Sequence, residues 1–138
     1  MGVVVDTSEL IEIERRSPNG DFDVTELSGD AYIAAITVGE LELGILLSTS
    51  SRMRELRERF FARINETVPV IPFGEAEARE WARIYAELRS SGMMIGERDL
   101  QIAATAIAGG HRVLTRNAGE FGRVSGLEVI TIDQQGAV

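Results

Sequence analysis

The architecture of this chain is organised around one apolar segment, Ile95-Gly96-Glu97-Arg98-Asp99-Leu100-Gln101-Ile102-Ala103-Ala104-Thr105-Ala106-Ile107-Ala108. Its apolar residues fall on nearly every side of a helix, which predicts a helix buried deep in the fold. Asp99 stands at the start of this helix, where burial would hold its carboxylate rigidly. Taken alone, Asp99 is an ordinary first-turn acid that complements the helix dipole. Carboxylates at similar junctions elsewhere in the chain favour a functional interpretation.

The composition predicts one ordinary globular domain. The chain has 138 residues, of which 44% are hydrophobic and 26% are charged, enough to bury a core of its own. No apolar run approaches the roughly 20 residues of a membrane span, and the chain does not start like a signal peptide. We therefore expect a cytoplasmic protein with no membrane partner.

The polar composition limits the chemistry. The chain lacks cysteine and has one histidine, His111, which excludes thiolate metal sites and argues against zinc. Any metal would be hard and oxygen-ligated, such as magnesium or manganese. The net charge of −8 gives no sign of a nucleic-acid binder in bulk, although all 14 basic residues are arginine. The locally basic helix around residues 52–63 is interpreted as a solvated face, with RNA guidance, pairing with a partner's acidic residues and a dimer surface left open.

Strands and helices alternate along the chain. Apolar runs predict strands at 3–5, 31–36, 68–72, 112–115 and 127–132, and helical spacing predicts helices at 9–16, 37–47, 52–64, 75–90 and from Asp99 onward, with a short turn or helix at 117–121. This order predicts an α/β fold with a mostly parallel sheet of about five strands flanked by helices. Two prolines place 68–72 at an edge or a strand end. We expect one domain over 1–133 and a loose tail over 134–138.

Acidic and hydroxyl side chains follow the predicted strands. Asp6 comes directly after the first strand, Glu40 lies one turn past the second, and Thr115, Asn117 and Glu120 follow the fourth. In a parallel sheet all of these lie at the carboxyl edge, where functional crevices form. Carboxylates gathered there would raise one another's pKa unless a cation lies among them. The cluster therefore predicts a divalent metal.

Each member also has a structural alternative. Thr37-Val38-Gly39-Glu40 matches a capping box, and Asp6 matches a helix N-cap. Glu120 fits an exposed loop acid, and the hydroxyls of Thr7, Ser8 and Thr115 fit caps or turns.

Other chemistries fit less well. A serine nucleophile would need His111, which follows a Gly-Gly turn and is expected at the surface, and no phosphate-binding loop or lysine exists.

Four motifs together resemble the PIN domains, and most closely the VapC toxins of VapBC toxin–antitoxin pairs. They are Val3-Val4-Val5-Asp6-Thr7-Ser8, Thr37-Val38-Gly39-Glu40-Leu41, Ile95 to Ala104, and Leu114-Thr115-Arg116-Asn117-Ala118-Gly119-Glu120-Phe121. The resemblance covers essentially the whole chain, with the motifs in the family's order and spacing.

The resemblance implies a PIN-like nuclease fold and a Mg²⁺- or Mn²⁺-dependent endoribonuclease. Asp6, Glu40 and Asp99 match the three most regular acidic metal-site residues. The family's fourth acid falls at Asn117 or, three residues on, at Glu120. Thr7, Ser8 and Thr115 match the hydroxyls that line such sites.

The resemblance also implies a homodimer and a VapB-type antitoxin whose tail covers the site. Arg98 and Arg116 adjoin the matched acids and are candidates for RNA contact. We expect a toxin that cleaves RNA, such as tRNA or rRNA, and slows translation. A catalytically idle RNA- or protein-binding module is the alternative that Asn117 keeps open, and a phosphatase is a remote third.

Overall fold

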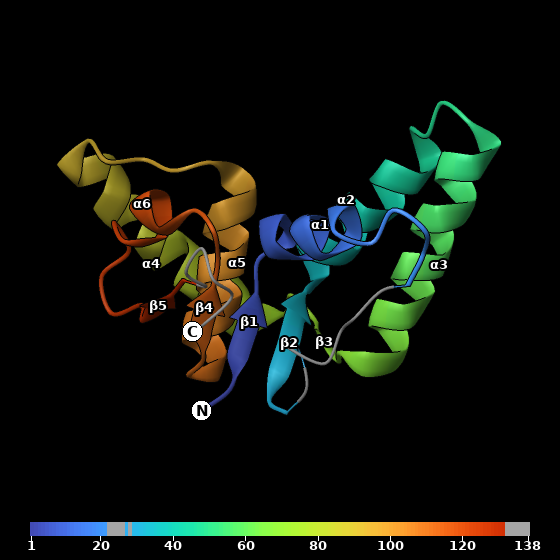
Figure 1. Cartoon of the computed structure of the whole chain (residues 1–138). Coiled ribbons are helices and arrows are strands. Elements are labelled where there is room, and N and C mark those ends of the chain that lie inside the picture. The colour runs from blue at the N-terminus through green and yellow to red at the C-terminus, as the bar shows by residue number, and fades with distance from the viewer. Residues whose placement is uncertain (22–26, 28, 132–138) are drawn as a thin grey trace.

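The computed structural model describes residues 1–21, 27 and 29–131. Six helices and five strands alternate through this part of the chain (Figure 1): β1 (Val3–Val5), α1 (Thr7–Arg15), β2 (Ala31–Ala34), α2 (Ala35–Leu46), α3 (Ser51–Thr67), β3 (Val70–Ile71), α4 (Glu75–Ser91), α5 (Glu97–Gly109), β4 (Arg112–Leu114), α6 (Ala118–Phe121) and β5 (Val129–Ile130). None of these helices is long and apolar enough to cross a lipid bilayer. The predicted tail over 134–138 lies outside the described residues. The mixed sequence of residues 21–30 predicts a loop with a possible short helix, and residues 22–26 and 28 of it also lie outside them.

The five described strands form one parallel sheet in the order β3-β2-β1-β4-β5. The predicted α/β fold is confirmed, and β3 lies at an edge as its flanking prolines predicted. β1 is central, with Val4 paired to Tyr32 of β2 and to Val113 of β4. Since every strand points the same way, their carboxyl ends lie at one edge, below α1 and the first turn of α5 in Figure 1.

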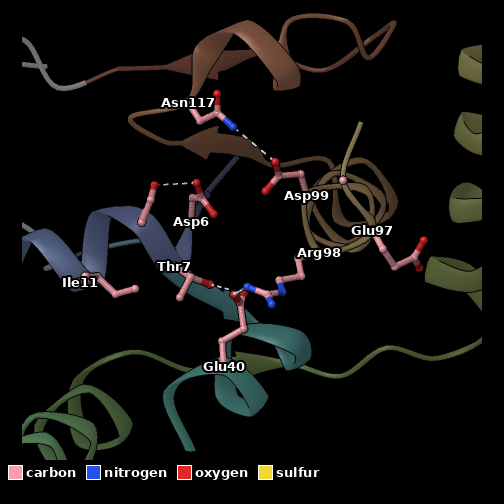
Figure 2. Close-up of a pocket in the computed structure, with 10 residues that line it drawn as sticks. Asp6, Thr7, Ile11, Glu40, Glu97, Arg98, Asp99 and Asn117 are labelled. Carbon is pink, nitrogen blue, oxygen red and sulfur yellow. Dashed lines mark hydrogen bonds and ion pairs between the residues drawn. The ribbon is translucent and has the colours of Figure 1, made fainter. Parts of the chain in front are cut away.

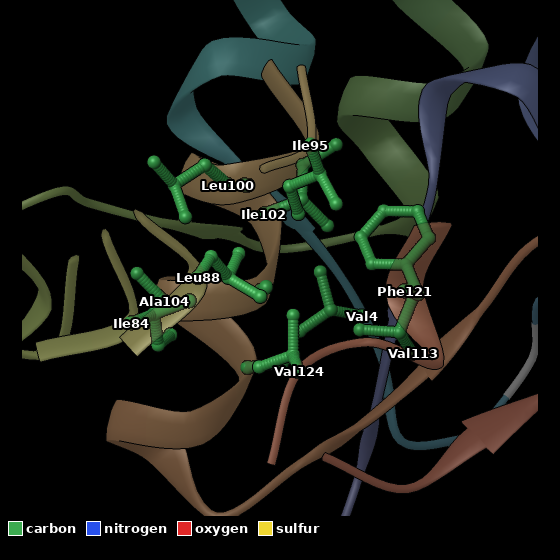
Figure 3. Packing of buried hydrophobic residues seen from close by; sticks show 13 residues of the cluster. Val4, Ile84, Leu88, Ile95, Leu100, Ile102, Ala104, Val113, Phe121 and Val124 are labelled. Atoms are coloured by element: carbon green, nitrogen blue, oxygen red, sulfur yellow. The ribbon is translucent and has the colours of Figure 1, made fainter. Parts of the chain in front are cut away.

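Consecutive strand residues supply cores on opposite faces of the sheet. Val4 and Val113 pack with residues of α4, α5 and α6, the cluster shown in Figure 3. Val5 and Leu114 belong to a second cluster with side chains of α1 and α3. This alternation follows from the two-residue period of a strand. Burial on both faces explains why β1 is continuously apolar.

α5 is the buried helix that the sequence predicted. Six of its side chains are buried: Leu100, Ile102, Ala103, Ala104, Thr105 and Ala106. The helix ends at Gly110, whose φ of 69° is the left-handed conformation that glycine adopts without a Cβ clash. The N-terminal end of α5, with Asp99 in its first turn, lies at the carboxyl edge of the sheet.

Three local predictions are wrong. The second helix begins at Ala35 and not at Thr37, because the apolar run 31–36 divides between strand and helix. On α4, helical spacing predicts a core stripe of Ala78, Trp81, Ala82, Tyr85 and Leu88. Leu88 is buried and Trp81 packs against the core, but Tyr85 is 36% exposed and Ile84, outside the predicted stripe, is buried. His111 is half-buried: its ring stacks on Tyr32, and its Nδ1 accepts the Gly2 N–H at 3.0 Å.

Candidate active site

A pocket of about 410 Å³ opens at the carboxyl edge of the sheet (Figure 2). It is lined by Asp6, Thr7, Ser8, Ile11, Glu40, Gly96, Glu97, Arg98, Asp99 and Asn117. These residues come from the ends of β1 and β4, from α1 and α2, and from the start of α5. The predicted convergence of carboxylates on one edge is confirmed.

Asp6 is the most firmly held of these acids. It is 4% exposed, and its Oδ2 accepts hydrogen bonds from Ser8 Oγ and Thr115 Oγ1, each at 2.7 Å. Asp6 occupies the N-cap position of α1, but its side chain makes no capping hydrogen bond. The capping alternative is therefore wrong, since hydroxyls of α1 and of the segment after β4 hold the carboxylate instead.

The carboxylate of Glu40 also accepts hydrogen bonds from side chains and does not cap a helix. Thr7 Oγ1 donates to its Oε1 at 2.8 Å, and Arg98 Nη1 donates to its Oε2 at 3.0 Å. The predicted capping box with Thr37 is wrong, because α2 begins two residues earlier and its N-cap is Ala34. The Thr37 hydroxyl is fully buried and lies 3.0 Å from Thr7 Oγ1. Thr37 thus supports Thr7, which in turn positions Glu40.

Asp99 has the most strongly perturbed acidity of the described pocket residues. Partial burial, a hydrogen bond with Glu120 and the charges of Asp6, Glu120 and Glu40 together raise the pKa of Asp99 to about 7. The pKa of Glu120 is lowered, chiefly by the same hydrogen bond. The two carboxyl groups titrate together, and Asp99 keeps its proton to a higher pH than Glu120 does.

The segment after β4 brings both candidates for the fourth position to Asp99. Asn117 lines the pocket, and its Nδ2 donates to Asp99 Oδ2 at 3.3 Å (Figure 2). Glu120 reaches Asp99 from α6. Thr115 is fully buried and fixes this segment, because its Oγ1 accepts the Asn117 N–H at 2.8 Å while donating to Asp6.

The two candidate arginines differ in their partners. Arg98 lies in the pocket and pairs with Glu40. Arg116 lies 3.7 Å from the carboxylate of Glu9, a fully buried residue of α1. Sequence reasoning missed Glu9, because one acid among the apolar residues of an amphipathic helix gives no sign of facing inward. The ion pair ties the segment after β4 to α1, beside the bonds of Asp6.

The donor chemistry of the pocket fits a hard divalent cation, since carboxylate, amide and hydroxyl oxygens converge there. Burial and repulsion from Asp6, Glu120 and Glu40 both raise the pKa of Asp99, and such an ion would relieve the repulsion. Across the described ranges, however, no three acidic, histidine or cysteine side chains are close enough to hold one ion. The acids instead keep hydroxyl, amide and guanidinium partners.

Fold and pocket together define an α/β protein with an acidic site at the carboxyl edge of a parallel sheet. The PIN-domain model matches residues 3–127, and the chain belongs to the PIN-domain family. Within that family it belongs with the VapC proteins: it is 35% identical to ribonuclease VapC1 of Rickettsia felis over 137 residues, which cover 98% of this chain and 99% of the relative. The resemblance inferred from the motifs is confirmed.

Solved structures agree with this assignment. VapBC-5 of Mycobacterium tuberculosis, a member of the VapBC family of toxin–antitoxin systems, superposes with a TM-score of 0.72 at 26% identity, over 94% of this chain and 95% of that one. VapBC2 of Rickettsia felis, solved with a promoter DNA fragment, gives a TM-score of 0.82 at 24% identity over 96% and 100% of the two chains. The second likeness supports the fold.

Proposed function

We propose that this protein is the toxin of a type II toxin–antitoxin pair and acts as a Mg²⁺- or Mn²⁺-dependent endoribonuclease. The observation that carries the proposal is the convergence of Asp6, Glu40 and Asp99 in one pocket, with the pKa of Asp99 raised to about 7. Strongly perturbed acids in a cleft are typical of catalytic sites. Relatives with the same fold carry the names ribonuclease and toxin–antitoxin system, which favours RNA over other phosphate esters.

Asp6, Glu40 and Asp99 would hold the metal, with Asn117 and Glu120 as further oxygen donors. A bound divalent ion would activate water and neutralise charge on the scissile phosphate. The protein's own residues keep these donors in place: Ser8 and Thr115 fix Asp6, and Thr7 fixes Glu40.

Three carboxyl groups have distinct roles in this proposal. Asp6, held by two hydroxyl donors, is the fixed ligand. Asp99 and Glu120 share a proton in the metal-free protein and must release it before both can act as ligands. As an alternative to serving as a ligand, Glu120 would accept or return a proton during hydrolysis. Arg98, which lines the pocket, and Arg116, which pairs with Glu9, are the proposed contacts for the phosphates of RNA.

The proposed partners are an RNA substrate, such as tRNA or rRNA whose cleavage would inhibit translation, a VapB-type antitoxin, and a second copy of the chain in a homodimer. Exposed apolar side chains support protein–protein contacts: Leu43 and Leu46 of α2 and its C-cap residue Leu47 are 48%, 58% and 66% exposed. The VapBC structures support an antitoxin partner. The exposed arginines of α3 stay a second candidate for RNA guidance, although Arg57 is occupied with the Gly44 carbonyl and Ser48.

The test is cleavage of total tRNA and ribosomal RNA by antitoxin-free protein in Mn²⁺ or EDTA, with Asp99→Asn as the control. The proposal predicts discrete fragments that require the metal and disappear in Asp99→Asn. Identical products from both proteins would mean that a contaminant cuts the RNA. A folded protein that neither cleaves RNA nor binds Mn²⁺ would favour the catalytically idle module.

A further inference from the structure

Arg98 neutralises a carboxylate of the pocket within the same chain. It stands in the first turn of α5, directly before Asp99, and its guanidinium reaches across the pocket to α2 (Figure 2). Its Nη1 lies 3.0 Å from Glu40 Oε2. The other oxygen of Glu40 accepts the Thr7 hydroxyl, so both oxygens of a proposed metal ligand have donors.

The two side chains of this ion pair differ in exposure and in their other contacts. The side chain of Glu40 is 17% exposed and is buttressed by Thr7, whereas that of Arg98 is 68% exposed. Arg98 also places a positive charge at the N-terminal end of a helix, where the macrodipole disfavours a cation. When the pair opens, Arg98 therefore moves and Glu40 stays.

We propose that Arg98 competes with the divalent metal for Glu40, and that its displaced guanidinium then binds a phosphate of the RNA. This inference rests on the proposed function. A cation at Glu40 Oε2 and the Arg98 guanidinium cannot occupy the same position, and the released side chain stays tethered beside Asp99. A guanidinium freed from a carboxylate is suited to a phosphate, which offers the same paired oxygens.

The neighbouring arginines are placed differently. Arg116 faces the buried Glu9, and Arg123 donates to the Met94 carbonyl at 3.0 Å. Of these three, Arg98 is the one paired with a pocket carboxylate. Its displacement would also free Glu40 to join a metal-binding set, which the described side chains do not form while the pair is closed.

The experiment titrates Mn²⁺ by calorimetry into wild type, Arg98→Gln and Arg79→Gln in the absence of RNA. Arg79 pairs with Glu75 on the exposed face of α4, so its variant makes the same change of net charge away from the pocket. Exposed ion pairs change an equilibrium constant by about two- to fivefold. We expect Arg98→Gln to bind Mn²⁺ about two- to fivefold more tightly than wild type, and Arg79→Gln to bind it equally.

The second readout is the KM for RNA at saturating Mn²⁺, measured over a range of salt. Loss of one phosphate contact should raise KM and reduce its slope against log salt concentration by about 0.7 in Arg98→Gln alone. A variant that has lost structure would bind both the metal and RNA more weakly. Tighter metal binding together with weaker RNA binding therefore cannot come from loss of structure. Circular dichroism would confirm that each variant is folded.

Unchanged or weaker Mn²⁺ binding in Arg98→Gln would overturn the competition, and an unchanged KM and salt slope would overturn the phosphate contact. Wild type that binds Mn²⁺, with Asp6→Asn that does not, would leave the proposed function standing in either case. Wild type that binds no Mn²⁺ would overturn the proposed function and this inference together.

Discussion

Replacing Asp99 by asparagine should stabilise the metal-free protein, by an amount that depends on pH. Burial, the Glu120 hydrogen bond and nearby charges raise the pKa of Asp99 from an ordinary value of 3.8 to about 7 in the folded protein. Below pH 4, Asp99 is protonated in both the folded and the unfolded states. Between pH 4 and 7 the unfolded chain releases this proton while the folded protein keeps it, so the carboxyl group lowers the free energy of unfolding as pH rises. Above pH 7 this loss is complete.

The size of the effect follows from the pKa difference. At about 1.36 kcal/mol for each pH unit, a difference of this size corresponds to at most about 4 kcal/mol. Asp99 is only partly buried, so solvent screening reduces the figure, and we expect about 1–2 kcal/mol at pH 8. Asparagine has a similar shape and does not ionise, so Asp99→Asn should avoid this loss.

The assay is urea unfolding in EDTA at pH 4.5, 6, 7 and 8, for wild type and Asp99→Asn. The free energy of unfolding of the variant minus that of wild type should grow from pH 4.5 to 7 and then level off. Glu55→Gln, which removes an exposed acid of α3, is the matched control and should show no such trend. A difference that stays constant with pH, or a variant less stable than wild type at pH 8, would refute the account of Asp99.

Other predictions concern the supports of the pocket, the sheet and the metal. Thr115→Val deletes the buried hydroxyl bonded to Asp6, and should lower the free energy of unfolding by about 1–3 kcal/mol in urea. Gly2→Ala would place a Cβ 2.6 Å from a ring carbon of Tyr32 and should lower the free energy of unfolding by about 1–3 kcal/mol. Gly44→Ala, in open space within α2, should raise the free energy of unfolding by about 0.5–1 kcal/mol. Equal effects of the two variants would contradict the packing. Free Mn²⁺ at 100 times its Kd should stabilise the protein by about 2.7 kcal/mol, and EDTA or Asp6→Asn should abolish that gain in a thermal-shift assay.

The sequence predicts the position of the site better than its internal contacts. Asp6 and Asn117 could be placed at one edge because each follows an apolar strand, and parallel strands end together. Asp99 could be placed because the helix that carries it is buried on nearly every side. These inferences need only local pattern and sheet direction, and the structure confirms them.

Contacts between distant segments leave no such pattern. The run Ala31 to Ile36 is apolar throughout, so nothing in it marks the change from β2 to α2. The sequence therefore also fits a capping box at Glu40, which the true helix start excludes. The Arg98–Glu40 pair joins residues 58 positions apart. Glu9 faces inward beside Arg116, which β4 brings next to it from a distant part of the sequence. Such pairs form when whole helices and strands pack together, so no single stretch of sequence predicts them.

An acidic protein must still attract a polyanion if it is a ribonuclease, and the pocket suggests how. The metal-free site holds two positive groups of its own among its acids: the proton between Asp99 and Glu120, and the guanidinium of Arg98 on Glu40. On the proposed exchange, a divalent ion would take the place of both: the proton would go to solvent, and the guanidinium would stay tethered at the rim. The site thereby gains one net positive charge and a free phosphate donor in one event. Metal and RNA should therefore bind with positive coupling, because each favours the state in which Arg98 has left Glu40.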